Sequence, residues 1–91
     1  MQQAKSVLKH YLSKRLCEWR KASLLTQEEA SEKFHISPRA YGDLERGKYC
    51  ISAVVLVLFL CLMDEDRSLS VIRMLREEIF KIPSYEYPGG E

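Results

Sequence analysis

Hydrophobic residues recur every three or four positions along most of the chain, a spacing typical of helices with one apolar face. Residues 6–22 predict the first such helix, and two short helices follow within residues 26–47. The apolar run over residues 53–63 has no polar face. A membrane span needs about 20 apolar residues, so this shorter run predicts a central buried helix. A buried strand has the same pattern, but the neighbouring helices favour a helix.

A last apolar face predicts a fifth helix over about residues 68–81, after an acidic connector at residues 64–66. The members of this face are Leu69, Ile72, Leu75, Ile79 and Ile82. Proline, glycine and polar residues then predict a flexible tail over residues 83–91. We therefore expect one all-α domain over residues 1–82, followed by the tail.

The chemistry that starts a helix occurs twice in the segment 26–47. Thr26 and Glu29 have the spacing of a capping box, in which each side chain binds the backbone N–H of the other residue. Ser37 is the second predicted N-cap, and Pro38 follows at the first helical position, where its missing N–H costs nothing. Gly47 is the expected left-handed stop of this second helix. Two short capped helices joined by a tight turn are the layout of a DNA-binding helix-turn-helix.

The net charge of +1 hides a division of charge along the chain. Residues 1–50 contain ten Lys and Arg against six Asp and Glu, a net charge of +4. Residues 51–91 contain four against seven, a net charge of −3. The basic half includes the predicted helix-turn-helix, which favours binding to nucleic acid with an affinity that falls as salt rises.

Cysteine and histidine usage excludes several kinds of site. The three cysteines, Cys17, Cys50 and Cys61, show no metal-ligand spacing, so we expect neither a zinc site nor a disulfide framework. With two histidines, no paired-carboxylate constellation and no glycine-rich phosphate loop, the chain shows no sign of an enzyme, a cofactor or a small-molecule ligand. Lysines in the first helix argue against a signal peptide, and the expected location is a reducing cytoplasm. Cys50, just after the second short helix, is either an inert cysteine or a redox sensor.

The order of these elements over residues 8–63 resembles the lambda-repressor-like (XRE/Cro) family of bacterial and phage regulators. Its most specific stretch is TQEEASEKF…ISPRAYGDLERGK. The resemblance implies a five-helix all-α fold with the helix-turn-helix at helices 2 and 3. It also implies a regulator of transcription, in the first place a repressor, that binds double-stranded DNA as a homodimer with helix 3 in the major groove.

The resemblance also assigns roles to residues around the motif. Gln27, at the start of helix 2, corresponds to a glutamine that contacts a DNA phosphate in the family. Arg20 and Glu45 correspond to a structural ion pair between helices 1 and 3. The other expected phosphate contacts are Thr26, Arg46, Lys48 and Tyr49.

The side of helix 3 that faces away from Tyr41 and Leu44 is the expected reader of bases. Arg39 is the first candidate, because its planar guanidinium matches O6 and N7 of guanine. Asp43 would orient it, and the other expected base contacts are Pro38 and Ala40. Alternatively, Arg39 and Asp43 form only an i,i+4 ion pair on a solvated helix face.

The chain departs from the family pattern at three positions. Leu24 and His35 stand where glycine is usual, which leaves open a strained or reshaped turn at each. Gly42, in the middle of helix 3, costs about 1 kcal/mol of helix stability relative to alanine. It either admits a close approach to DNA or marks a frayed helix.

Two questions of assembly and function stay open at this point. Helix 5 either forms a dimer seam through Ile72, Leu75 and Ile79 or only packs on helix 1 to complete the core. The low total charge and the few candidate base contacts also admit a second function, a protein-interaction module of the antitoxin or anti-repressor type with little or no DNA binding.

Overall fold

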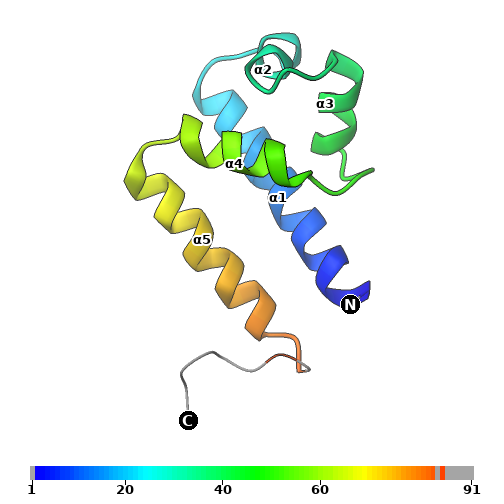
Figure 1. Ribbon diagram of the computed structural model, residues 1–91, viewed down its shortest axis with the longest axis vertical. Coiled ribbons are helices and arrows are strands. Elements are labelled where there is room, and N and C mark those ends of the chain that lie inside the picture. The colour runs from blue at the N-terminus through cyan, green and yellow to red at the C-terminus, as the bar shows by residue number, and fades with distance from the viewer. Residues whose placement is uncertain (1, 84, 86–91) are drawn as a thin grey trace.

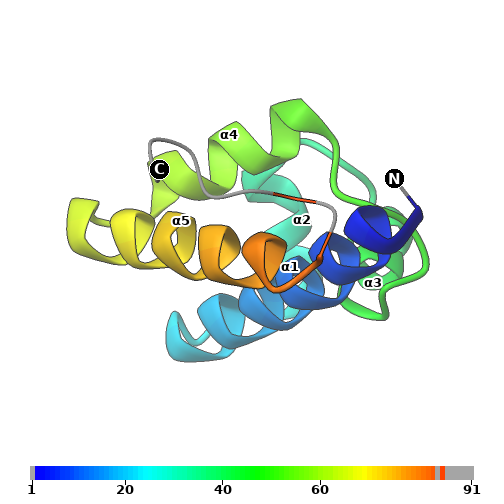
Figure 2. The ribbon, with the colours of Figure 1, turned by 90° about the horizontal axis from the view of Figure 1, so that it is seen from below.

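The computed structural model describes residues 2–83 and residue 85 of the chain, and that part is all-α as predicted (Figure 1). It contains five helices, which are α1 (Gln2–Ala22), α2 (Gln27–Lys33), α3 (Pro38–Glu45), α4 (Ala53–Leu62) and α5 (Glu65–Phe80). Helices α1 and α5 lie side by side (Figure 2), and α2 and α3 pack on each other at one end of the molecule. The two short helices of the motif are thus held on a scaffold of three longer ones.

The main core is an aromatic cluster that joins four of the helices. Trp19 of α1 meets Phe34 and Phe59 edge-on, with ring centroids 5.5 and 5.9 Å apart. Phe34 also stacks on Tyr41 of α3 at 5.9 Å. Such aromatic pairs add stability beyond the apolar area that they bury. This cluster fixes α3 against α1 and α4.

Helix α5 packs on α1 through part of the predicted apolar face and through Val71, which lies outside that face. Val71 is buried against Tyr11 and Leu12, and Leu75 packs at the same cluster. Ile72, a member of the predicted face, is 41% exposed. Helix α5 carries two apolar stripes that differ by one position, and spacing alone does not show which of them α1 covers. The predicted apolar face is therefore buried in part, at Leu75 and Ile82, and exposed at Leu69 and Ile72.

The acidic segment before α5 is the start of the helix and not a connector, so its predicted start near residue 68 was wrong. Oδ1 of Asp64 accepts a hydrogen bond from the backbone N–H of Arg67 at 2.8 Å, and Asp64 is the N-cap. Glu65 and Asp66 form the first turn, where negative side chains interact favourably with the helix dipole. At the other end, the predicted tail lies outside the described residues apart from Pro83 and Tyr85.

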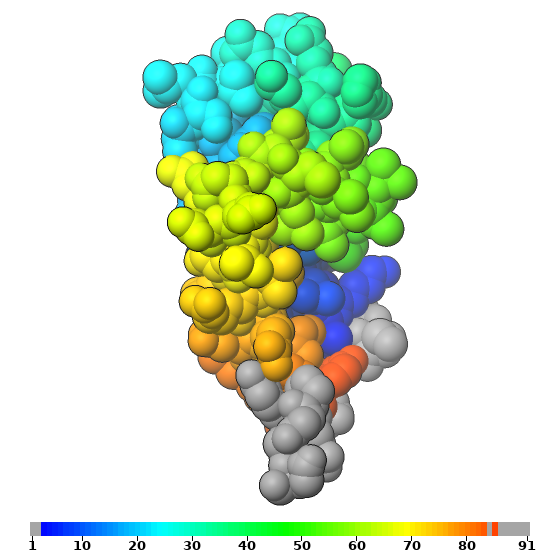
Figure 3. All heavy atoms as spheres, turned by 60° about the vertical axis from the view of Figure 1, so that its left-hand side comes forward, coloured from blue at the N-terminus to red at the C-terminus, as the bar shows by residue number. Residues whose placement is uncertain are grey.

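Helix α4 forms over the predicted apolar run, but the prediction that it is centrally buried was wrong. Val55 and Phe59 are buried, whereas Val54 is 69% exposed and Val57 is 57% exposed. A helix that is apolar all round needs neighbours on every side, and the other helices cover only one side of α4. Helices α4 and α5 therefore both contribute to the outer surface of the molecule (Figure 3).

The first three helices end in the same motif, in which a left-handed residue closes the last turn. At the end of α1, the N–H of Leu25 donates to the carbonyl of Arg20, and the N–H of Leu24 donates to that of Lys21, both at 3.1 Å. Leu24 has a φ of 60° and is 90% exposed. The left-handed turn that glycine favours thus forms here with leucine in its place.

The same hydrogen-bond pattern closes α2 and α3. Ile36 N–H donates to the Ser31 carbonyl, and Lys48 N–H donates to the Asp43 carbonyl. The left-handed residues are His35, with a φ of 57°, and Gly47, with a φ of 74°. Because a side chain at this φ costs about 1–2 kcal/mol, Leu24 and His35 strain the two turns that flank α2.

We predict that Leu24→Gly and His35→Gly each raise the free energy of unfolding by about 0.5–1 kcal/mol. Relief of the left-handed strain exceeds the conformational entropy that glycine loses on folding, which is about 0.5–1 kcal/mol. Both side chains are exposed, so little packing is lost. Urea denaturation followed by circular dichroism measures the change.

Lys21→Gly is the matched control, because Lys21 is exposed and lies inside the last turn of α1. It should lower the free energy of unfolding by about 1 kcal/mol. Equal losses for Lys21→Gly and Leu24→Gly would contradict the assignment of strain to Leu24.

Candidate nucleic-acid interface

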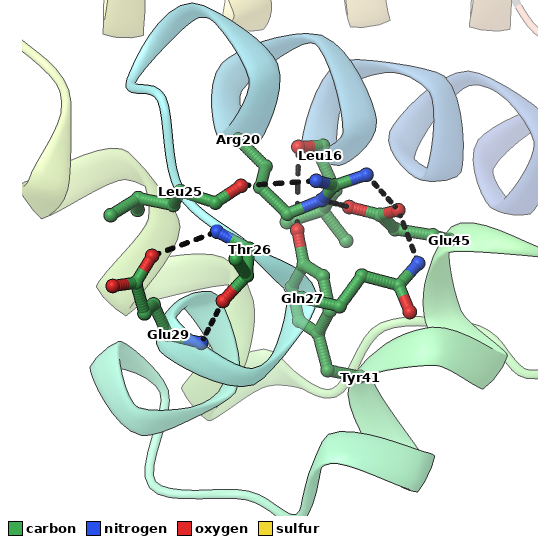
Figure 4. A network of polar contacts seen from close by, with 8 residues as sticks. All are labelled: Leu16, Arg20, Leu25, Thr26, Gln27, Glu29, Tyr41 and Glu45. Atoms are coloured by element: carbon green, nitrogen blue, oxygen red, sulfur yellow. Dashed lines mark hydrogen bonds and ion pairs between the residues drawn. The ribbon is translucent and has the colours of Figure 1, made fainter.

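Three side chains from three helices form a polar clasp at the centre of the motif, and we call Arg20, Gln27 and Glu45 the clasp (Figure 4). Arg20 Nε donates to Glu45 Oε2 at 2.7 Å, and Arg20 Nη2 donates to Glu45 Oε1 at 3.1 Å. Only 15% of the Arg20 side chain and 5% of the Glu45 side chain are exposed. This is the predicted ion pair, and its two parallel bonds tie the end of α1 to the end of α3.

Gln27 is the part of the clasp that faces outward. Its Nε2 donates to Glu45 Oε1 at 2.9 Å. An amide nitrogen carries two hydrogens, so one remains to donate to a further acceptor such as a phosphate oxygen. The network thus holds the first residue of α2 in one orientation relative to α3.

Gly42 makes room for this arrangement, a role that sequence reasoning missed. A Cβ placed on Gly42 would lie 3.3 Å from Gln27 Oε1 and 3.3 Å from Arg46 Nη1. Gly42 is buried beneath these two side chains and is not open to a ligand. The available signal was the glycine itself, in the middle of an otherwise well-capped helix.

The clasp shifts the acidity of its members. Burial alone would raise the pKa of Glu45, but the hydrogen bonds from Arg20 and Gln27, together with the positive charge of Arg20, outweigh it and hold this pKa below its usual value. Burial, followed by the nearby Glu45 carboxylate, raises the pKa of the Tyr41 phenol. The Tyr41 hydroxyl donates to the Leu16 carbonyl at 3.4 Å, so Tyr41 is a neutral support beneath α3.

The predicted base contacts differ in how far the structure exposes them. Arg39 and Pro38 are exposed, and Ala40 is half-buried. Asp43 is only 6% exposed and pairs with Arg46 instead of Arg39. Arg46 lies three residues later and covers Asp43, and a carboxylate out of water requires such a partner. The prediction that Asp43 lies on the exposed face beside Arg39 was therefore wrong.

The predicted phosphate contacts lie around the same end of the molecule. Thr26 and Glu29 form the predicted capping box, in which Thr26 Oγ1 accepts from the Glu29 N–H at 3.0 Å. The Thr26 hydroxyl hydrogen is not used in that bond. Arg46, Lys48 and Tyr49 are exposed, with Lys48 Nζ 5.5 Å from the centroid of the Tyr49 ring.

Other kinds of site are poorly supported in the described residues. Within residues 2–83 and residue 85, no three His, Cys, Asp or Glu side chains gather to hold a metal ion. In the same part of the chain, no helix combines the length and the apolar content needed to cross a membrane. Cys50 and Cys61 are exposed thiols, and Cys17 is partly buried.

We predict that Arg20→Ala lowers the free energy of unfolding by about 3 kcal/mol, because it leaves the Glu45 carboxylate buried without its cation. The contribution of Glu45 should depend on pH in a defined direction. Its pKa is lower in the folded state than its ordinary value of 4.5. Its stabilising effect is therefore complete above about pH 4.5 and is lost as the pH falls through the folded-state pKa.

Chemical denaturation of the wild type, Arg20→Ala and Glu45→Gln across pH checks both statements. The difference in the free energy of unfolding between the wild type and Glu45→Gln should be constant at neutral pH and shrink in acid. Arg67→Ala is the control, since its ion pair with Asp64 is exposed and 3.9 Å long, and it should change stability by no more than about 0.5 kcal/mol. If the difference in the free energy of unfolding between the wild type and Glu45→Gln grew in acid, this would contradict the role given to Glu45.

Comparison with known proteins agrees with this geometry. A helix-turn-helix family model matches residues 18–68, which contain the end of α1, all of α2 to α4 and the start of α5. No match was found among curated proteins or among solved structures. The matched segment covers more than half of the chain and includes the whole clasp. The chain belongs to the lambda-repressor-like (XRE) helix-turn-helix family of DNA-binding regulators.

Proposed function

We propose that this protein is a cytoplasmic, sequence-specific transcriptional repressor that binds double-stranded DNA as a homodimer, with α3 in the major groove. The observation that carries the proposal is the clasp. It holds Gln27, the first residue of α2, against Glu45, the last residue of α3. A phosphate-binding group and a base-reading helix are thus fixed in one geometry, as sequence-specific binding requires.

Phosphate contacts set the position of the protein on DNA. The free amide hydrogen of Gln27 and the hydroxyl of Thr26 serve as neutral donors at the start of α2. Arg46 and Lys48 supply positive charge at the end of α3, and Tyr49 adds a hydroxyl. These contacts carry affinity and salt dependence and little sequence information.

Base reading rests on Arg39. Its side chain is exposed on the first turn of α3, and it forms none of the ion pairs found in the described residues. The Asp43 carboxylate, which was expected to hold it, is occupied by Arg46. Arg39 is therefore free to offer two of its guanidinium N–H groups to a guanine, with Pro38 and Ala40 as the apolar contacts beside it.

We predict that Arg39→Ala weakens binding to the preferred site by about 1–3 kcal/mol and relaxes sequence preference at one base pair. Gln27→Ala should weaken all sites alike, because it removes a phosphate contact. Sites selected from a random DNA library, followed by mobility-shift titration of each variant, provide the measurement.

Lys48→Ala should reduce the slope of log affinity against log salt by about 1, whereas the neutral change Gln27→Ala should leave that slope unchanged. Arg73→Ala on α5 is the control and should bind as the wild type does. An unchanged preferred sequence for Arg39→Ala would refute direct readout by Arg39.

A second copy of this chain is the proposed partner of α5. Ile72 is exposed and next to Leu69, which is 56% exposed. Leu75 packs in the cluster with Tyr11, and Ile79 is half-buried, so these two predicted seam residues support the fold at least as much as an interface. A two-fold dimer would place two α3 helices on half-sites one helical turn, about 34 Å, apart.

We predict that the wild type is a dimer at micromolar concentration and that Ile72→Glu is a folded monomer. A buried, unpaired carboxylate would oppose association, whereas the exposed position makes Ile72→Glu harmless to the isolated fold. Light scattering measures the mass, with Arg73→Glu as the control that should stay dimeric. A wild type that is monomeric at this concentration would contradict the proposed dimer.

One observation favours a second candidate function. The exposed side chains Val54, Val57 and Leu62 leave α4 with an apolar outer surface, as expected of a protein-interaction module of the antitoxin or anti-repressor type. In that case the DNA selection described above should enrich no sequence.

A further inference from the structure

A cavity of about 370 Å³ that is open to solvent lies between α1 and α5, and its lining includes no residue of the clasp or of α3. Helix α4 contributes Phe59 to its wall, and buried Trp19 and Val71 supply further apolar surface. Ligand pockets in proteins span about 300–1,000 Å³ and are mostly apolar with a few placed polar groups. The size and the lining of this cavity both fit that class.

The polar edge of the cavity is dominated by two guanidinium groups from facing helices, Arg15 of α1 and Arg67 of α5. Arg15 lies over the Tyr11 ring at 4.9 Å and donates from Nη2 to Glu18 Oε2 at 2.6 Å. Its Nε is buried and has no hydrogen-bond partner in the described part of the chain. A buried donor without an acceptor is costly, so an acceptor supplied by a ligand would be bound favourably.

Arg67 is the second cation at this edge. Its side chain is 63% exposed, and its ion pair with Asp64 is long, at 3.9 Å. Glu18 is the one carboxylate among the lining residues. Within the lining, two guanidinium groups thus stand beside one carboxylate, and Asp64 pairs with Arg67 from outside the lining.

We propose that this cavity binds a small aromatic carboxylate. The ring of the ligand would pack against the accessible edge of Trp19 and against Met74, and its carboxylate would accept hydrogen bonds from Arg15 and Arg67. Guanidinium groups bind carboxylates with paired, charge-assisted bonds, and aromatic rings stack on or meet each other edge-on. The proposal goes beyond DNA binding and does not depend on it, because none of the lining residues belongs to α2 or α3.

The chain provides its own reporter for a test. Trp19 is its only tryptophan and lines the cavity. We expect hydrocinnamate, an aromatic carboxylate, to change the Trp19 fluorescence of the full chain in a saturable way. The neutral analogue hydrocinnamamide has the same ring and should bind at least about tenfold more weakly, as expected for loss of a charge-assisted hydrogen bond.

Variants of α1 and α5 test whether the change in Trp19 fluorescence comes from binding in the cavity. Arg15→Gln should weaken hydrocinnamate binding at least about tenfold. Arg73→Gln is the matched control, an exposed arginine of α5 outside the lining, and should bind as the wild type does. Ser70→Phe adds a ring at an exposed lining position without changing the charge of the cavity and should abolish binding, which keeps the test valid if Arg15→Gln does not fold.

Any of three results would overturn the proposal. These would be a wild type that does not respond to hydrocinnamate, an amide that binds as tightly as the carboxylate, or a Ser70→Phe variant that binds as the wild type does. The second result would show an apolar site without selectivity for an anion. No DNA is used in these measurements, so their failure leaves the proposed repressor function untouched.

Discussion

The position of α3 depends on the ion pair between Arg20 and Glu45. Its Nε to Oε2 distance is 2.7 Å, and both side chains are largely out of water, so neither charge is stable without the other. Glu45 also accepts the Gln27 amide, which links the pair to the start of α2. One carboxylate therefore sets the relation between the scaffold, the start of α2, for which we propose phosphate contacts, and α3, for which we propose base reading. The aromatic cluster around Phe34 supports the same relation from inside.

Local chemistry was the part of the fold best predicted from the sequence. Thr26 and Ser37 cap α2 and α3 as expected, because an N-cap is decided by residues within one turn. The Arg20 and Glu45 pair is 25 positions apart in sequence, and only resemblance to a family indicated it. Leu24 and His35 adopt a left-handed backbone conformation that neither residue type favours by itself, so tertiary packing holds these two turns in place.

The predictions that were wrong concern which faces of the helices are buried. Asp43 was expected to face solvent beside Arg39, yet it is buried under Arg46. Val71, and not Ile72, packs against α1, and half of α4 is uncovered. Helical spacing defines stripes but not their partners, so these outcomes required the three-dimensional arrangement. Loss of Asp43 from the reading face leaves Arg39 as the main candidate for direct recognition.

We propose that the clasp presents α2 and α3 as the DNA-binding surface. Titration of the isotope-labelled wild type with its selected DNA, followed by backbone amide chemical shifts, tests this most directly. The account predicts that the largest shifts occur at the start of α2 and in α3, around Gln27 and Arg39, with small shifts over most of α5. Shifts confined to α4 and α5, with α2 and α3 unchanged, would contradict it.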